Sequence, residues 1–569
     1  MAYKWDLRNI YIKKEDFYYD MTLVRDKIKK ISEHREFKVD GNSLYELMKE
    51  CFIIREINSK TLLYASLNYY IDINNDLYIT MKKQAEELDN FVNNETNFID
   101  ELISIIDDDK LDDFYSECPD LLSYKYYIDN IRSLSNHLIT DNYNDLNDNV
   151  IKKNSLLVDY NKLLNSMSFG DINGIPLSIS NISSYLVDEE RSVRKRAFNS
   201  LNSSYLLEGD KYFDIFNKLV DIKKDIATYK KYSSVLDGEL SNEGIDIKVI
   251  DNLINSVNKN ILLMNKYLSF KMDYLKIKDP RMYDINIPIC SCEDKVDIDS
   301  ALNIIKSSLS CLGKDYIKVI DLLVKDKHLE LEVDEKKHQT ITFSWNTYTF
   351  MNYKDRYLDL KNLIHELGHI VNSYYSQLTK PFIYSDSTIF TSEVMSLVNE
   401  ILLNEYLYSK ADSKEKKIFY LTKNIENFIS QVFRQTLYTE FENIVYNSKM
   451  LTLDEVNDSY LNLINKYYGK VTTVDENLKC EWMRVGHLFR WNYYVYKYAI
   501  GYILAFNVVR KVKADNSKYI EFISSGASCS NVDMLKKLDI DLYDEKLIDN
   551  SFDLLNDYIS LLIKLCEEK

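Results

Sequence analysis

Residues 361–371 read KNLIHELGHIV and contain the pattern H-E-x-x-H. Positions four apart on a helix lie on the same face, so His365 and His369 can bind one metal ion. Glu366 lies about a quarter turn away, beside a water on that metal rather than on the metal itself. The stretch therefore predicts a helix over 360–377 that presents two metal ligands and a general base.

The other face of this predicted helix is apolar. It carries Leu360, Leu363, Ile364, Leu367, Ile370 and Val371. We expect that face to pack into a core while the histidines point toward a cleft. A pair of hydrogen-bonded structural histidines is the alternative, but seven His in 569 residues make a chance match to the motif rare.

The composition favours a mostly helical chain and excludes some partners. Twelve Gly and five Pro in 569 residues are few helix breakers. A formal charge of −17 argues against binding a nucleic-acid backbone. No apolar run is long enough to span a membrane, and the N-terminus lacks a signal-peptide pattern. Eight scattered Cys without framework spacing are typical of reduced thiols, so we expect a cytoplasmic protein.

Helical periodicity organises most of the chain. It predicts successive helices through 15–34, 41–75, 76–107, 120–138 and 141–166, with acidic runs such as 107–109 at the joints. It resumes from about 188 to 275 and again near 297–325.

Two short stretches break this pattern and predict β-structure. Asn173-Gly174 between apolar flanks predicts a small β-hairpin near 167–179. Alternating Thr, Phe and Tyr predict a short sheet near 339–353, directly before the metal helix. An exposed strand edge there could pair with an extended peptide.

Two histidines are an incomplete catalytic zinc site, which normally has a third protein ligand and one open position. The candidate is Glu393, where the next helix begins. Glu400 lies two turns further on the same face and could hydrogen-bond a ligand histidine. Asp386 could have a similar orienting role, or it could cap the following helix.

A tyrosine-rich segment follows far downstream, from Gly486-His487 to Tyr502. Tyrosine and histidine side chains can donate hydrogen bonds to the oxyanion that forms when an amide is hydrolysed. From the residues alone, a helix this rich in tyrosine is favoured as part of a core.

These residues together resemble the M3 family of zinc peptidases, specifically the oligoendopeptidase F branch. The resemblance rests on five segments: HELGH at 365–369, NSYYS at 372–376, SDS at 385–387, Glu393 with Glu400, and YVYKYA at 494–499. It implies a mostly helical, two-lobed zincin-type body with a deep channel. It implies an N-terminal helical lobe over 1–180 and a catalytic domain over 181–569.

The resemblance also implies the site and the activity. His365, His369 and Glu393 would bind one Zn²⁺ per chain, and Glu366 would be the base. His487 and a tyrosine of 494–498, Tyr498 foremost, would stabilise the tetrahedral intermediate. The expected function is a metalloendopeptidase that cleaves short, unstructured peptides and spares folded proteins. A helical peptide-binding or scaffold protein with a structural or inactive metal site is the alternative.

Overall fold

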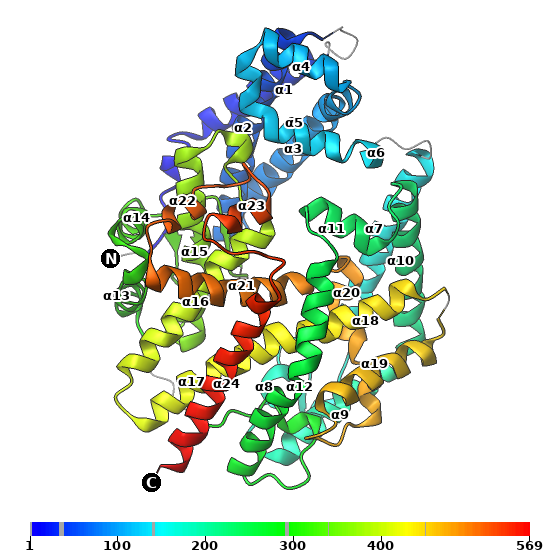
Figure 1. Ribbon diagram of the computed structural model, residues 1–569, viewed down its shortest axis with the longest axis vertical. Helices are drawn as coiled ribbons and strands as arrows, with labels where there is room; N and C mark the ends of the chain where they lie inside the picture. The colour runs from blue at the N-terminus through cyan, green and yellow to red at the C-terminus, as the bar shows by residue number, and fades with distance from the viewer. Residues whose placement is uncertain are drawn as a thin grey trace. The chain divides into compact units, whose positions relative to one another are not determined.

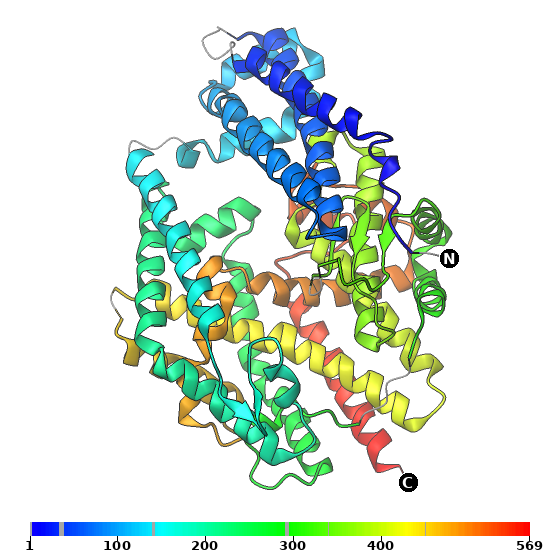
Figure 2. The same ribbon diagram turned by 180° about the vertical axis from the view of Figure 1, so that it is seen from behind.

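A computed structural model describes residues 3–32, 39–138, 143–290, 295–338, 341–449 and 451–568. Within these ranges the chain is mostly helical, as Figures 1 and 2 show, and it has two small sheets. The chain forms two compact units. The first comprises Met1–Ile139, Glu293–Leu403 and Val508–Ile540, and the second comprises Thr140–Cys292, Asn404–Asn507 and Asp541–Lys569. None of the helices in the described ranges is long and apolar enough to cross a membrane.

Three long helices dominate the N-terminal part of the first unit: α1 (Lys14–Ser32), α2 (Gly41–Ile71) and α3 (Asp76–Ser104). They lie side by side in Figure 2, where they are drawn in blue, and share an apolar core. The side chains of Asp40 and Asn75 accept hydrogen bonds from the first backbone N–H groups of α2 and α3, which fixes where these helices begin. The shorter helical segments here are η1 (Leu7–Asn9), α4 (Asp108–Glu117), η3 (Pro119–Tyr124), α5 (Lys125–Ser133) and α6 (Ser135–Leu138).

A three-stranded sheet lies in the same unit. Its strands are β3 (Leu329–Glu330), β4 (Phe343–Trp345) and β5 (Tyr348–Phe350), in the order β3-β5-β4. β4 pairs antiparallel with β5, and the tight turn between them places Asn346 in the left-handed region, at φ 56°. β3 pairs parallel with β5, so β4 is an edge strand.

The helices that follow the sheet complete the first unit. They are α13 (Ile298–Ser308), η5 (Ser310–Leu312), α14 (Lys314–Lys325), α15 (Tyr357–Thr379), η6 (Phe382–Tyr384), α16 (Ile389–Lys410), α22 (Tyr519–Ile523) and α23 (Asn531–Lys536). Helix α16 continues past Leu403 into the second unit.

The second unit is almost entirely helical in its described residues. Its elements are α7 (Tyr143–Ser166), β1 (Asp171–Ile172), β2 (Ile175–Pro176), α8 (Ile182–Tyr185), α9 (Arg191–Leu207), α10 (Gly209–Tyr229), α11 (Val235–Glu243), α12 (Lys248–Tyr274), η4 (Met282–Asp284), α17 (Lys414–Phe428), η7 (Ile429–Arg434), α18 (Gln435–Asn447), α19 (Leu453–Tyr468), η8 (Glu476–Arg484), α20 (Gly486–Arg490), α21 (Tyr496–Ala514) and α24 (Glu545–Glu567). Segment η7 is a π-helix inserted between two α-helices.

The mostly helical fold expected from the sequence is confirmed, with the hairpin at β1–β2 and the short sheet before α15. Residues 339 and 340 of the expected sheet and 141 and 142 of the expected helix lie outside the described residues. The acidic run at 107–109 lies at a joint between helices, as expected, but helix α4, which starts in this run, was missed. Its first carboxylates face the positive end of the helix dipole. The two-residue strand β3 was also missed. The domain boundary at 180/181 stays a prediction.

Candidate metal centre and active site

Helix α15 carries the H-E-x-x-H pattern, and at its start the carboxylate of Asp359 accepts hydrogen bonds from the backbone N–H and the guanidinium of Arg356. The six apolar residues of its predicted rear face are all at most 1% exposed. This confirms the expected orientation of the helix, because a face buried this completely leaves the opposite face to carry the histidines.

Gly368 lets the neighbouring helix approach this face closely. A Cβ atom at this position would lie 2.7 Å from the Cα of Ser396 on α16. Such a distance is shorter than any ordinary contact, so a larger residue would push α16 away. The glycine inside HELGH therefore sets the distance between α15 and the helix that carries Glu393 and Glu400.

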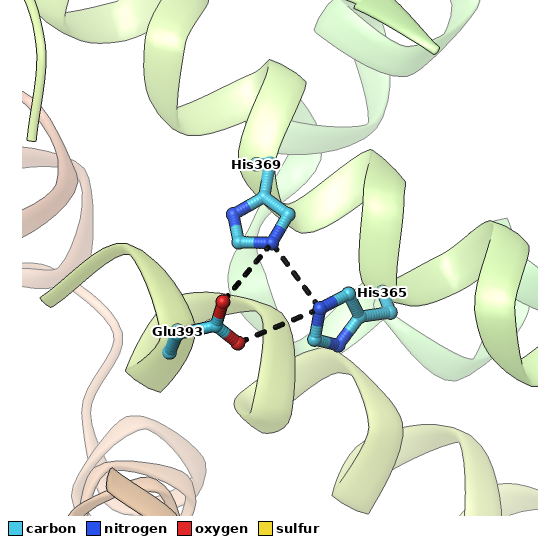
Figure 3. Close-up of side chains that lie close together, drawn as sticks. All are labelled: His365, His369 and Glu393. Carbon is cyan, nitrogen blue, oxygen red and sulfur yellow. Dashed lines mark hydrogen bonds and ion pairs between the residues drawn. The ribbon is translucent and has the colours of Figure 1, made fainter. Parts of the chain in front are cut away.

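Three side chains from these two helices point toward one another, as Figure 3 shows. The Nε2 atoms of His365 and His369 are 3.2 Å apart. Carboxylate oxygens of Glu393 lie 3.6 Å from Nε2 of His365 and 4.0 Å from Nε2 of His369. The structure thus brings the three predicted metal ligands together.

This donor set fits a zinc ion. Ligand bonds of about 2.0–2.1 Å in tetrahedral geometry separate the ligand atoms by about 3.3 Å, close to the observed spacings. One donor atom from each of the three residues lies within 4.8 Å of the other two. Two imidazole nitrogens and a carboxylate aimed at one point repel one another unless a cation or a proton lies between them.

The outer nitrogen of each histidine has its own partner. Nδ1 of His365 lies 2.7 Å from Oε1 of Glu400, whose other oxygen is 3.0 Å from Nζ of Lys361. Nδ1 of His369 lies 2.8 Å from Oγ of Ser392. Partners of this kind fix the ring orientation and leave Nε2 as the atom that faces a metal.

Burial disfavours the protonated form of both rings, but the charges around them differ. At His365 the hydrogen bond and charge of Glu400 outweigh burial and raise the pKa to about 9. At His369 burial, together with the charge of His365, lowers the pKa to about 3. At neutral pH and without a metal, these shifts leave the His365 ring protonated and the His369 ring neutral.

Glu366 follows His365 and is buried. Burial raises the pKa of its carboxyl group, while the charge of His365 opposes that shift. Its backbone carbonyl accepts a hydrogen bond from Oγ of Ser344 on β4 at 3.1 Å. This bond ties the edge strand to the helix at the residue expected to act as base.

Asp386 does not hydrogen-bond either histidine. It is exposed and borders a cavity of the first unit that is described below. At the start of α16, Oγ1 of Thr388 accepts a hydrogen bond from the N–H of Thr391. The orienting partner of His369 is Ser392, which the sequence analysis missed; its position directly before Glu393 was the available signal.

His487 and Tyr498 lie together in the second unit. The hydroxyl of Tyr498 is 3.3 Å from Nε2 of His487, although the two residues are 11 positions apart. The ring of Tyr494 stacks on His487 at 5.8 Å between centroids. Burial lowers the pKa of His487, so its ring is neutral at pH 7.

Two side chains from other helices hydrogen-bond the backbone of the turn between these two residues. Nζ of Lys223 donates to the carbonyl oxygens of Leu488 and Trp491, at 3.3 and 3.0 Å. The N–H of Tyr493, a residue with φ 41°, donates to Oε1 of Glu442 at 2.7 Å. Both side chains come from helices distant in sequence, α10 and α18.

Comparison with known proteins places this geometry in a family. The sequence profile of peptidase family M3 matches residues 333–554. Oligopeptidase PepF of Bacillus subtilis (strain 168) is 27% identical over 573 residues, which cover 95% of this chain and 83% of the relative. An oligoendopeptidase F homolog of Borreliella burgdorferi is also 27% identical, covering 97% of this chain and 96% of its own.

A solved structure agrees along the whole length. The crystal structure of a Chlamydophila abortus protein provisionally described as a peptidase superposes with a TM-score of 0.88 and 27% identity. The match covers 99% of this chain and 98% of that one. With HELGH, Glu393 and Glu400 in place on α15 and α16, residues 333–554 match peptidase family M3, and the chain is a metallopeptidase similar to the oligoendopeptidases F.

Proposed function

We propose that the protein is a zinc-dependent endopeptidase that hydrolyses internal bonds of short, unstructured peptides. The observation that carries the proposal is the convergence of His365, His369 and Glu393, with Glu366 one position along the same helix. Three protein ligands leave a fourth position open, which is the arrangement of catalytic rather than structural zinc sites.

His365, His369 and Glu393 would hold one Zn²⁺ per chain. When bound, zinc acidifies a coordinated water and polarises a carbonyl group. Glu400 and Ser392 keep the imidazole rings in the orientation that this binding needs, because each accepts or shares a hydrogen bond at the outer ring nitrogen.

Glu366 acts as the general base and then as the general acid. Its carboxylate accepts a proton from the attacking water as the water oxygen bonds to the scissile carbonyl carbon. The carboxylic acid then delivers that proton to the leaving nitrogen as the C–N bond breaks. Burial suits this cycle, because it brings the pKa of the carboxyl group closer to neutrality.

His487 and Tyr498 stabilise the negative charge that develops on the carbonyl oxygen. The Tyr498 hydroxyl is a hydrogen-bond donor, and its contact with His487 Nε2 fixes where the hydroxyl points.

The substrate backbone pairs with the free edge of β4. This strand pairs only with β5 among the described residues, so an extended peptide could add as the next strand. A cavity of about 760 Å³ adjoins the β4–β5 turn at Trp345 and Asn346 and reaches Glu56 and Lys60 on α2. Its volume is in the range of sites that bind small molecules and short peptide segments.

Helices α1 and α2 contribute one wall of that cavity, through Asp20 and through residues between 56 and 63, and restrict what can enter. A folded protein would have to unfold before a segment could lie along β4, and nothing in the cavity offsets that free energy. We expect cleavage of unstructured peptides of roughly 5–20 residues, a limit set by reach at about 3.3 Å per residue. Incubating a short peptide and a stable folded protein together, with mass spectrometry of both, tests this; equal digestion would exclude size selection.

Cleavage of a quenched fluorescent peptide with and without a chelator tests the function itself. The purified protein should contain about one zinc per chain, lose activity on chelation and regain it when zinc is restored. Full activity in a preparation shown to be free of metal would exclude the zinc mechanism. Metal binding without any cleavage of a varied peptide library would favour a scaffold protein with an inactive site.

A further inference from the structure

The second unit contains a cavity of about 470 Å³ that the peptidase chemistry does not use. Its wall is built by residues of α12, α17, the π-helix η7, α18 and η8, together with the segment around η4. All of the residues that line it belong to the second unit, whereas His365, His369 and Glu393 belong to the first.

The charge of this cavity is opposite to that of the whole chain. Four basic side chains line it, Lys271, Lys423, Arg434 and Arg484, against two acidic ones, Glu426 and Glu481. The lining therefore carries two net positive charges in a protein whose formal charge is −17. Grouped cations repel one another, so a cavity of this composition is stabilised when an anion enters it.

Both carboxylates in the lining are already engaged. Glu481 accepts hydrogen bonds from Arg434, Arg484 and the Tyr460 hydroxyl. These arginines hold the pKa of Glu481 down at about 2, against the effect of burial, so it stays ionised. Oε1 of Glu426 accepts from Lys271 Nζ at 2.6 Å and from the Tyr267 hydroxyl at 3.0 Å.

Arg484 and Lys423 have N–H groups that make no hydrogen bond to a described residue. Arg484 uses Nη2 for Glu481, and its Nε and Nη1 make no hydrogen bond to the residues that the structure describes. Lys423 forms no ion pair with a described carboxylate; its ammonium lies over the Phe419 ring, 5.3 Å from the centroid. Guanidinium N–H groups in a cavity are the donors best matched to a bidentate oxyanion.

The backbone at this cavity is unusual. Residues Ile429–Arg434 form a π-helix, and both Ser430 and Arg434 from it line the cavity. Nε of Arg434 donates to the Tyr438 hydroxyl at 2.9 Å, and the guanidinium lies over the Tyr438 ring at 5.0 Å. Such π-helical insertions cost regular hydrogen bonding and occur frequently at functional sites.

From these observations we propose that the cavity is a binding site for a small organic molecule carrying a doubly charged oxyanion, a phosphate monoester. Arg484 and Arg434 bind its oxygens, with Lys423 as the further positive charge. Phe198, Tyr283 and Ile429 in the same lining contact the organic part. The volume suits a molecule larger than a bare ion. Binding at this cavity would not depend on the peptidase centre or on its metal.

Calorimetric titration at constant ionic strength tests the proposal, with inorganic phosphate and phenyl phosphate as probes and chloride as the balancing salt. Wild-type protein should bind phenyl phosphate more tightly than inorganic phosphate. Arg484→Gln should weaken phenyl phosphate binding at least tenfold. Lys479→Gln is the matched control, because Lys479 lies on the same segment η8, pairs with Glu476 and does not line the cavity.

Lys423→Gln is a second variant, which leaves the hydrogen bonds of Glu481 to Arg434, Arg484 and Tyr460 intact. It tests the proposal if Arg484→Gln fails to fold. It should weaken binding severalfold, and chelation of the metal should change nothing. Equal affinity in wild type, Arg484→Gln and Lys423→Gln would overturn the proposal. Phenyl phosphate binding that disappears when added chloride raises the ionic strength would overturn it too, since that is the behaviour of non-specific charge attraction.

Discussion

The metal-ligating group and the His487–Tyr498 pair are positioned by different physical means. In the first unit, two long helices hold His365, His369 and Glu393, and the helical repeat itself puts the two histidines on one face. The close approach at Gly368 then brings Glu393 and Glu400 within reach. Regular structure determines nearly all of this geometry.

In the second unit, a turn holds His487 and Tyr498. Five-residue helix α20 ends at Arg490, α21 begins at Tyr496, and the residues between them include a left-handed Tyr493. Lys223 and Glu442 hold that turn through three hydrogen bonds to its backbone. These are buried ionisable side chains on distant helices.

The difference predicts which of the two groups tolerates substitution. Removing a ligand or the base on α15 changes the chemistry but leaves the helix intact, because burial of its apolar face stabilises it. Changing a support of the turn changes where the donors lie, because nothing in the local sequence fixes them. The four predictions below test this contrast, from the largest expected effect on activity to the smallest.

Glu366→Gln has the largest expected effect. The amide cannot accept the proton of the attacking water, so kcat should fall by a factor of about 10²–10⁴. The zinc content should stay near wild type, because Glu366 is not a ligand. Elemental analysis and peptide cleavage on the same preparation measure both. Zinc-loaded Glu366→Gln with wild-type turnover would remove this residue from the mechanism.

Tyr498→Phe should lower kcat by about 10²-fold, the usual effect of losing one oxyanion donor. KM and zinc content should change little. Tyr494→Phe and Tyr496→Phe are the matched controls on the same segment, because Tyr494 stacks on His487 and Tyr496 is buried. If Tyr494→Phe loses activity and Tyr498→Phe does not, the donor is Tyr494.

The same contrast between regular helices and tertiary packing explains which residues could be predicted from the sequence. The H-E-x-x-H spacing and the apolar positions of α15 need only the helical period, and the structure places all of them as expected. Glu393 was chosen as the carboxylate where the next helix begins, and Glu400 because it lies seven residues further on the same helix face. Ser392 and the contact of Lys361 with Glu400 were missed, because both depend on how closely two helices pack.

The turn in the second unit is beyond sequence reasoning. His487 and Tyr498 are 11 residues apart, a spacing that no regular helix brings into contact, and only the family resemblance pointed to them. Lys223 and Glu442 lie 265 and 51 residues from the backbone groups that they bond. Such contacts follow from tertiary packing, which a single sequence does not reveal.

Glu400→Gln should weaken zinc binding by about 10–100-fold and lower activity only when zinc is limiting. The amide keeps a hydrogen bond to His365 but lacks the charge that favours the metal-binding orientation. Asp386→Asn is the control, because Asp386 bonds neither histidine. Competition with a chromophoric chelator measures the affinity. Equal zinc affinity in wild type and Glu400→Gln would show that packing alone orients His365.

The last prediction concerns pH and the turn. Burial raises the pKa of Glu442 to about 8, with the charge of Glu239 acting in the same direction and that of Lys223 opposing it. In the unfolded chain this carboxyl group titrates near pH 4.5. Because the folded-state pKa is the higher one, Glu442 stabilises the fold fully below about pH 4.5. That contribution is lost as the pH rises to about 8.

Glu442→Gln should therefore remove part of the pH dependence of the second unit. The glutamine oxygen can still accept the N–H of Tyr493, but the side chain no longer titrates, so the decline in stability between pH 5 and 8 should become shallower. One proton accounts for at most about 1.4 kcal/mol per pH unit. Thermal unfolding of wild type and variant across this pH range measures the difference, and activity at pH 7 should change less than about threefold, since the turn keeps its bond. Glu440→Gln, on the same helix and paired with Lys466, is the control and should keep the wild-type slope. Parallel curves for wild type and Glu442→Gln would show that Glu442 is ionised in the folded protein, and the turn would then depend on a fixed charge instead of a protonated one.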